Sequence, residues 1–181
     1  GPAARLPVDR VLAASHRLGL TPAFAERVYD LAFADGLRLR SVFPGCLLNV
    51  NVSREFLSTG LAIDTVLRSA HRCQVPLSEV VLELTEDVAA GLSGDLLFSE
   101  LRRAAELGMQ VVIDDFGRGE TSLSLLRRLP LAAIKLDRSL LPSGTDERDW
   151  EFVEGVLALL SKITGRIIAE GVEDRQQSRS L

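Results

Sequence analysis

The sequence predicts an α/β protein in which helices join parallel strands. Short apolar segments of strand type alternate with amphipathic segments of helical type, and no two strand segments follow each other directly. Each strand segment also ends in a polar or charged residue. This alternation allows two architectures, a (β/α) barrel or an open doubly wound sheet. The 181 residues, 46% of them hydrophobic, are enough for one domain with a sizeable core over residues 1–181.

The first part of the chain is mainly helical. Helices are expected over residues 6–19 and 21–36, because apolar residues recur on one side and a glycine closes each stripe. Thr21 matches an N-cap, followed by a proline at the first helical position. The first strand is expected over residues 46–53, and helical patterning resumes over residues 56–70.

The second part of the chain supplies four more strands and the helices between them. The strands are expected at residues 80–86, 111–115, 132–137 and 166–170. The helices are expected around residues 97–105, 121–128 and 145–160, with Thr145 as a cap, and again near the C-terminus. No glycine-rich phosphate-binding motif follows the first strand, which disfavours the nucleotide-binding open sheets.

The stretch 111–122 carries the most information. Three β-forming residues run directly into Asp114 and Asp115, and Gly117 and Gly119 loosen the loop behind them. Adjacent carboxylates repel each other and are costly at an apolar boundary unless a positive charge lies between them. A solvated strand end would explain two aspartates, but it would not explain the polar residues on the other strands.

Composition excludes several partners. The net charge is −4 and the pI is about 5.3, so there is no electrostatic case for a nucleic-acid or membrane-surface partner. Two cysteines are too few for a disulfide framework and indicate a reducing, cytoplasmic setting. No apolar run approaches the roughly 20 residues of a membrane span.

The polar residues share one position, the carboxyl end of a strand. In a (β/α) barrel these ends converge on one face, where the active site is built. A single acid at such a place is usually a helix cap or a solvated rim residue, whereas a set spread over five strands predicts a shared site. The set is Asn51, Glu83, Asp114 with Asp115, Lys135 and Glu170.

The ligand types suggest the chemistry of this site. Carboxylate and amide oxygens without His or Cys suit the hard cations Mg²⁺ or Mn²⁺. Two adjacent aspartates can serve two metals, as in-line phosphoryl displacement requires. Lys135 can then orient the attacking water or neutralise a phosphoryl oxygen. A structural ion pair of Lys135 with Asp114 or Glu170 is the alternative that the same geometry permits.

Six segments resemble the EAL family of cyclic-di-GMP phosphodiesterases, in the order and spacing of that family. They are residues 50–53 (Val-Asn-Val-Ser), 82–86 (Leu-Glu-Leu-Thr-Glu), 114–117 (Asp-Asp-Phe-Gly), 129–130 (Leu-Pro), 134–139 (Ile-Lys-Leu-Asp-Arg-Ser) and 169–173 (Ala-Glu-Gly-Val-Glu). The resemblance implies a modified TIM barrel that hydrolyses cyclic-di-GMP to linear pGpG with two Mg²⁺ or Mn²⁺ ions. It also implies a cytoplasmic homodimer in bacterial second-messenger signalling.

The resemblance assigns roles by motif match. Asn51, Glu83 and Asp114 would be metal ligands, Asp115 would serve the second metal, and Glu170 would bind a metal or its water. Lys135 would hold the nucleophilic water. Glu86 would brace the loop that couples metal binding to dimerisation. That loop comprises Phe116, Gly117, Arg118, Gly119 and Glu120.

Three departures from the family pattern leave an alternative open. The barrel is expected to be incomplete at both ends in this chain, because the Glu-Ala-Leu strand and the final Gln-Gly strand are absent. The loop has Arg118 and Glu120 where the family has threonine and tyrosine, and an added acid there should weaken metal binding unless Arg118 offsets it. We favour an enzyme, and the alternative is an inactive domain that acts as a cyclic-di-GMP receptor or a protein-interaction module.

Overall fold

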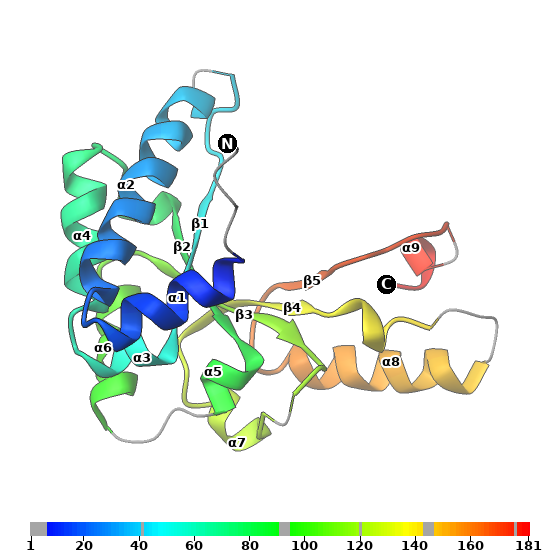
Figure 1. Ribbon diagram of the computed structural model, residues 1–181. Helices are drawn as coiled ribbons and strands as arrows, with labels where there is room; N and C mark the ends of the chain where they lie inside the picture. The colour runs from blue at the N-terminus through cyan, green and yellow to red at the C-terminus, as the bar shows by residue number, and fades with distance from the viewer. Residues whose placement is uncertain (1–6, 41, 91–94, 120, 143–146, 176) are drawn as a thin grey trace, which may run out of the picture.

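A parallel five-stranded sheet forms the centre of the protein (Figure 1). The computed structural model describes residues 7–40, 42–90, 95–119, 121–142, 147–175 and 177–181. The strands are β1 (Leu48–Asn51), β2 (Val80–Thr85), β3 (Gln110–Phe116), β4 (Leu131–Leu136) and β5 (Ile167–Ala169). They lie side by side in the order of the sequence, and every neighbouring pair is parallel. A doubly wound sheet reverses its strand order at a switch point, so this order favours the barrel alternative.

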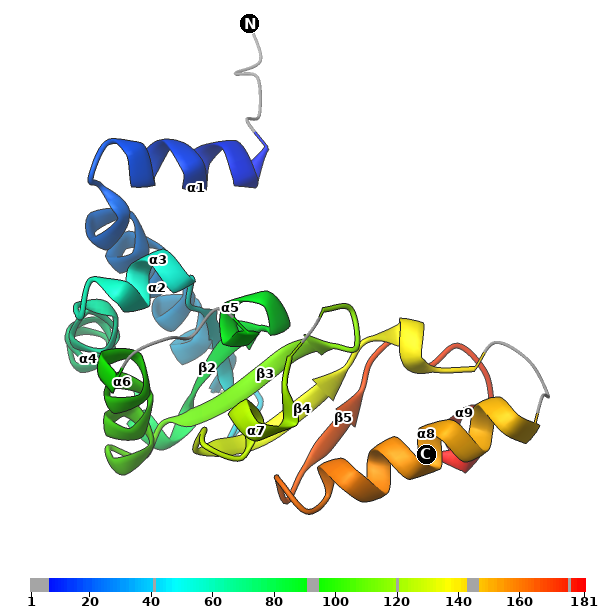
Figure 2. The same ribbon diagram turned by 90° about the horizontal axis from the view of Figure 1, so that it is seen from below.

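Helices cover one side of the sheet, except for the first helix, which contacts the second helix and lies away from the strands (Figure 2). The longer ones are α1 (Val8–Arg17), α2 (Thr21–Arg40), α4 (Ala62–Arg72), α6 (Asp95–Glu106) and α8 (Glu147–Leu160). The shorter ones are α3 (Arg54–Ser58), α5 (Glu86–Ala90), α7 (Leu123–Leu126) and α9 (Gln177–Ser180), with 3₁₀ turns at Leu77–Glu79 and Arg138–Leu140. Figures 1 and 2 show α2, α4 and α6 grouped beside β1 and β2, and α8 running beside β5.

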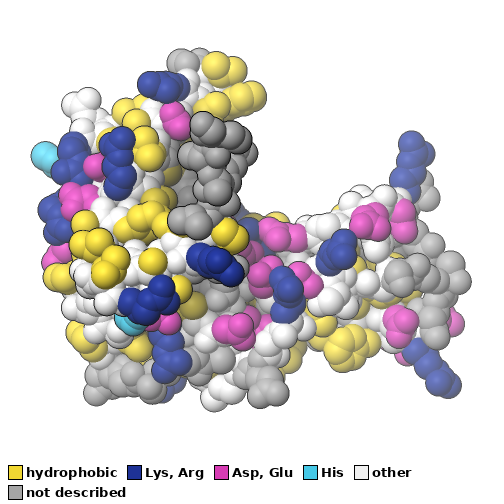
Figure 3. All heavy atoms as spheres, in the orientation of Figure 1, with side chains coloured by type: hydrophobic (Ala, Val, Ile, Leu, Met, Phe, Trp, Pro, Cys, Tyr) yellow, Lys and Arg dark blue, Asp and Glu magenta, His cyan; other side chains and the backbone are white. Residues whose placement is uncertain are grey.

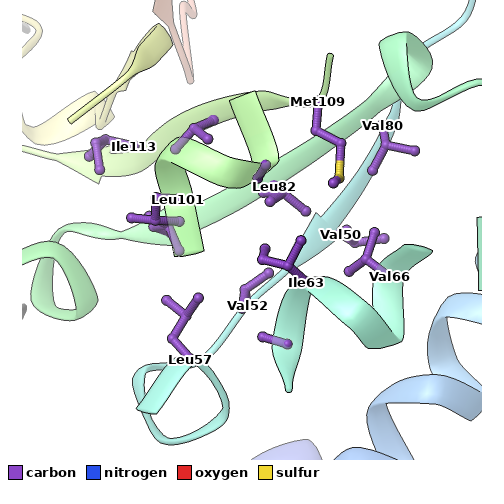
Figure 4. Packing of buried hydrophobic residues seen from close by; sticks show 14 of the residues in the cluster. Val50, Val52, Leu57, Ile63, Val66, Val80, Leu82, Leu101, Met109 and Ile113 are labelled. Atoms are coloured by element: carbon purple, nitrogen blue, oxygen red, sulfur yellow. The ribbon is translucent and has the colours of Figure 1, made fainter. Parts of the chain in front are cut away.

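The main core lies between the sheet and this group of helices (Figure 4). Every second residue of a strand faces the helices, as for Leu82 and Ile113, and both are fully buried. Ile63 of α4 and Leu101 of α6 meet them from the helix side and are also fully buried. Each such side chain contributes about 1.5–3 kcal/mol by leaving water, so this layer fixes the strand positions.

The opposite face of the sheet carries a smaller apolar layer. Val81, Val112 and Ala133 form a separate buried cluster there. Two residues further along the same strands come Glu83, Asp114 and Lys135. Because side chains alternate with a period of two, these charged groups lie on the same face as the small apolar layer, nearer the carboxyl ends of the strands.

Several predicted boundaries were wrong. The second helix does not end at Gly36 but continues to Arg40, and Thr21 is its first residue, with a hydroxyl that is buried and makes no hydrogen bond. The first strand is limited to Leu48–Asn51, and the helix expected at residues 121–128 spans only Leu123–Leu126 behind a Ser122 cap. Helix α5 was not predicted. The expected cap Thr145 lies outside the described residues.

Gly36 lies inside α2, at the point where the helix passes close to β1. A Cβ atom built on Gly36 would lie 2.5 Å from both Cδ atoms of Leu48, whose side chain is buried. The missing side chain therefore makes room for a packed neighbour and does not mark the end of the helix.

Two glycine-to-alanine substitutions should consequently have opposite effects. We expect Gly36→Ala to lower the free energy of unfolding by about 1–2 kcal/mol, because overpacking outweighs the gain in helix propensity. Gly155→Ala in α8 is the matched control, because a Cβ there meets nothing within 4 Å. It should raise stability by about 0.5–1 kcal/mol. Urea unfolding of both variants checks this, and two shifts of equal sign would contradict it.

Candidate active site

Lys135 is the centre of the candidate site. Its Nζ atom lies 2.7 Å from Oε1 of Glu170, 3.0 Å from Oε1 of Glu83 and 3.1 Å from Oδ1 of Asp114. These three carboxylates come from β2, from β3 and from the residue just after β5. Acidic groups separated by up to 87 positions in the sequence thus meet at one point, as the sequence pattern predicts. In the view of Figure 3, acidic and basic side chains gather over the region where β3, β4 and β5 run.

The charge balance of this cluster is set by burial and pairing together. Burial alone would lower the pKa of Lys135, but the ion pairs with Glu170, Glu83 and Asp114 outweigh burial and hold the pKa above its usual value. Lys135 is therefore positively charged throughout the neutral pH range. Glu83 is only 6% exposed, and an uncompensated carboxylate there would be costly.

An irregularity in β3 brings Asp115 to the same side as Asp114. Along a regular strand, two adjacent residues point to opposite faces. Between β3 and β4, however, the register shifts between Ile113 and Phe116, and Asp115 has a left-handed backbone with φ of 55°. As a result, one oxygen each of Asp114, Asp115 and Glu170 lies within 4.8 Å of the others.

Asn51 lies on the same face of the sheet, at the end of β1. It pairs in register with Glu83, and laterally paired residues of parallel strands point to the same side. Its side chain is exposed. The Tyr29 hydroxyl of α2 donates to the Asn51 carbonyl oxygen at 3.2 Å, and burial raises the pKa of Tyr29. This anchor fixes the end of β1 against the helix layer.

Glu86 does not join the acidic cluster but holds the loop that follows it. Its Oε2 atom accepts hydrogen bonds from the backbone N–H groups of Gly117 at 2.8 Å and Gly119 at 2.7 Å. Its Oε1 atom accepts from the Thr121 N–H at 2.9 Å. Burial raises the pKa of Glu86, but these donors, Thr121 first, outweigh burial and hold the pKa below its usual range. Glu86 is thus a buried anion that organises the loop.

The loop itself carries a cation close to the aspartates. Nη1 of Arg118 lies 3.5 Å from Oδ2 of Asp115, and the two side chains are 63% and 38% exposed. Such a surface pair contributes only about 0–1 kcal/mol. Phe116 is partly buried and packs against the main core, while Gly117 has φ of 110°, which a residue with a side chain rarely adopts. Glu120 lies outside the described residues.

Two residues near the site were not predicted from the sequence. The side-chain N–H group of Asn49 in β1 donates a hydrogen bond to Oε1 of Glu83 at 2.7 Å. Asn49 stands two residues before Asn51, so the period of a strand could have suggested that it shares the same face. Tyr29 could not have been found this way, because its role depends on how α2 lies against the sheet.

The fold and the cluster define a class of protein. Parallel strands in sequence order, with carboxylates and a lysine at their carboxyl ends, describe a (β/α) barrel with an oxygen-rich site. The chain belongs to the EAL domain family, whose sequence profile matches residues 2–181. The predicted family membership and the predicted barrel-type α/β fold are thereby confirmed.

Relatives with names and structures agree with this assignment. The chain is 37% identical over 129 residues to the cyclic di-GMP phosphodiesterase NbdA of Pseudomonas aeruginosa. This match covers 71% of this chain and 16% of NbdA. It is similar to the phosphodiesterase PaMucR in complex with c-di-GMP, with a TM-score of 0.77, 29% identity and coverage of 95% and 75% of the two chains. It also resembles Klebsiella pneumoniae BlrP1 in a manganese and cy-diGMP complex, with a TM-score of 0.71, 25% identity and coverage of 88% and 41%.

The curated relatives are longer than this chain. The chain spans 16% to 35% of the length of the curated relatives it matches. Across the described part of the chain, no helix is both long enough and apolar enough to cross a membrane.

Proposed function

We propose that this chain is a metal-dependent phosphodiesterase domain that hydrolyses cyclic-di-GMP to linear pGpG. The observation that carries this proposal is the convergence of Glu83, Asp114 and Glu170 on Lys135 in a member of the EAL domain family. The names of the relatives NbdA and PaMucR, which state cyclic-di-GMP phosphodiesterase activity and a c-di-GMP complex, support the substrate.

The residues present fit a site for divalent cations. Asp114, Asp115 and Glu170 each place one oxygen within 4.8 Å of the others. Carboxylate oxygens without His or Cys are the ligands that hard cations prefer. Asn51, Glu83, Asp114, Asp115 and Glu170 would hold two such ions. When bound, the ions would supply charge neutralisation at the phosphate and activation of water.

Lys135 and the loop would do the remaining work. If divalent cations bound the carboxylates, the charged Nζ atom of Lys135 would be available to hold the attacking water or a phosphoryl oxygen by a charge-assisted hydrogen bond. Glu86 would keep the segment after Asp115 in place by accepting its backbone N–H groups. Asn51 is exposed and Asp115 and Glu170 are partly exposed, so the substrate would enter from their side.

We propose Mg²⁺ or Mn²⁺ as the working ion, a homodimer in which the loop from Phe116 to Glu120 couples metal binding to association, and a cytoplasmic location. The BlrP1 manganese and cy-diGMP complex supports the metal. The Glu86 contacts with Gly117, Gly119 and Thr121 support such coupling, because they connect this segment to the end of β2.

One observation supports a second candidate function. Lys135 and Arg118 place two positive charges among four carboxylates, and these side chains balance part of the negative charge that would attract a divalent cation. An inactive domain of this kind could serve as a receptor for cyclic-di-GMP or as an interaction module. The receptor would bind the dinucleotide without cleaving it, and binding would survive the removal of divalent cations.

Turnover in the presence and absence of metal separates the two functions. We expect the chain to convert cyclic-di-GMP to pGpG with Mg²⁺ or Mn²⁺ and to stop when EDTA is added, as measured by chromatography of the nucleotides. Asp114→Asn should lower the rate by about 100-fold or more, since it removes a charge from the cation site. Asp35→Asn, which removes an exposed acid of α2, should not. Binding without turnover in either metal would favour the receptor.

A further inference from the structure

We infer that Asn49 is a positioning residue that fixes Glu83 for cation binding. The inference rests on the proposed function, in which Glu83 is a ligand. The Asn49 side-chain amide donates to Oε1 of Glu83 at 2.7 Å, which is short for a neutral donor and typical of a bond to an ionised carboxylate. The acceptor is buried while Asn49 is exposed, so this bond lies at the edge of the buried region and is partly shielded from water.

The two oxygens of Glu83 have different surroundings. Oε1 accepts from Asn49 and is also 3.0 Å from Nζ of Lys135. Oε2 has no hydrogen bond to any residue that the structure describes. Two donors on one oxygen fix the rotation of the carboxylate, which leaves the second oxygen available to a cation. Lys135 alone could not do this, since it also contacts Asp114 and Glu170.

The neighbours of Asn49 argue against a purely structural role. Asn49 pairs in register with Val81, a member of the small apolar layer on this face of the sheet. An apolar side chain at position 49 would extend that layer. An asparagine forgoes this packing, and its bond to Glu83 is the interaction gained in return. Charge neutralisation does not require it either, because Lys135 already pairs with Glu83.

The expected consequence is a weaker cation site when the amide is lost. Partners that orient a metal ligand typically change metal affinity by about 10–100-fold when they are removed. We expect Asn49→Leu, which keeps the shape but removes the donor, to weaken Mn²⁺ binding by this factor. Asn49→Gln keeps the amide on an exposed, adaptable side chain and should recover most of the affinity.

Calorimetric titration of the chain with Mn²⁺ tests the inference without relying on turnover. Gln110→Ala is the matched control, because it removes another strand amide that donates to the Ser78 carbonyl and not to the site. Circular dichroism and thermal unfolding verify that each variant is folded, and Asn49→Gln remains informative should Asn49→Leu not fold.

Each outcome has one meaning. Weaker binding in Asn49→Leu, with affinity retained in Asn49→Gln and Gln110→Ala, supports the inference. Affinity of Asn49→Leu within about twofold of the unchanged chain overturns it, as does an equal loss in Asn49→Gln and Asn49→Leu, and the proposed function stands if Asp114→Asn still abolishes binding. An unchanged chain that does not bind Mn²⁺ overturns the metal-dependent function and the inference together.

Discussion

Replacing Lys135 with methionine should destabilise the metal-free protein by about 3 kcal/mol and abolish measurable hydrolysis. Methionine keeps the length of the side chain but removes the charge that pairs with Glu83, Asp114 and Glu170. Breaking a buried ion pair from one side is costly because it leaves uncompensated charge, and the Glu83 and Asp114 side chains are only 7% and 18% exposed. Denaturant unfolding in EDTA measures the first effect.

Divalent cations should separate the two roles of Lys135. Saturating Mg²⁺ would supply positive charge to the same carboxylates, so we expect it to restore most of the stability of Lys135→Met by binding to the folded state. It should not restore turnover, because no group would then hold the attacking water. Lys162→Met, which changes the other lysine of the chain at an exposed position, is the matched control. Full activity in Lys135→Met would refute the role proposed for this residue.

The pH dependence of this contribution has a definite sign. The pKa of Lys135 is raised in the folded protein, so the stabilisation is fully present below the unfolded value of about 10.4. It is lost only as the pH rises through the folded pKa. The difference in stability between the unchanged chain and Lys135→Met should therefore persist across the neutral range and begin to shrink only in strong alkali.

The period of two along a strand explains how much of the site was predictable. Glu83 and Lys135 each interrupt an apolar strand near its carboxyl end, two residues after Val81 and Ala133 on the same face. Parallel pairing in sequence order then brings these ends together without any knowledge of loops. The number of strands was recoverable from the apolar segments, whereas their order was not, because a doubly wound sheet shows the same alternation with a different strand order.

Features that depend on departures from regular geometry were not predictable. The joint orientation of Asp114 and Asp115 requires an extra residue in β3, and nothing in the pair itself signals a bulge. The sequence predicted the end of a helix at Gly36 because glycine commonly follows the last turn of a helix. The structure instead gives a packing reason for a glycine at this position, because the Leu48 side chain of β1 leaves no room for a Cβ atom. In both cases the cause involves a second element, the pairing with β4 for the aspartates and the Leu48 side chain of β1 for Gly36.

Replacing Glu86 with glutamine should disturb the loop more than any other neutral substitution near the site. The carboxylate accepts from the N–H groups of Gly117, Gly119 and Thr121, and it is 4% exposed. Glutamine offers one oxygen, and its NH₂ group must face N–H donors. We expect a loss of about 3 kcal/mol in the free energy of unfolding, since bonds to charged groups contribute about 1.5–3 kcal/mol each.

Acid should reveal the same interaction in the unchanged chain. Because the folded pKa of Glu86 is lowered, its stabilisation is present above the unfolded value of about 4.3 and is lost as the pH falls through the folded pKa. The stability difference from Glu86→Gln should be constant above about pH 5 and shrink below pH 4. Asp87→Asn removes the adjacent, exposed acid of α5 and should show neither effect. A difference that does not change between pH 3 and about pH 7 would mean that the loop is held by packing and not by the Glu86 anion, so that Asp115 would keep its position without it.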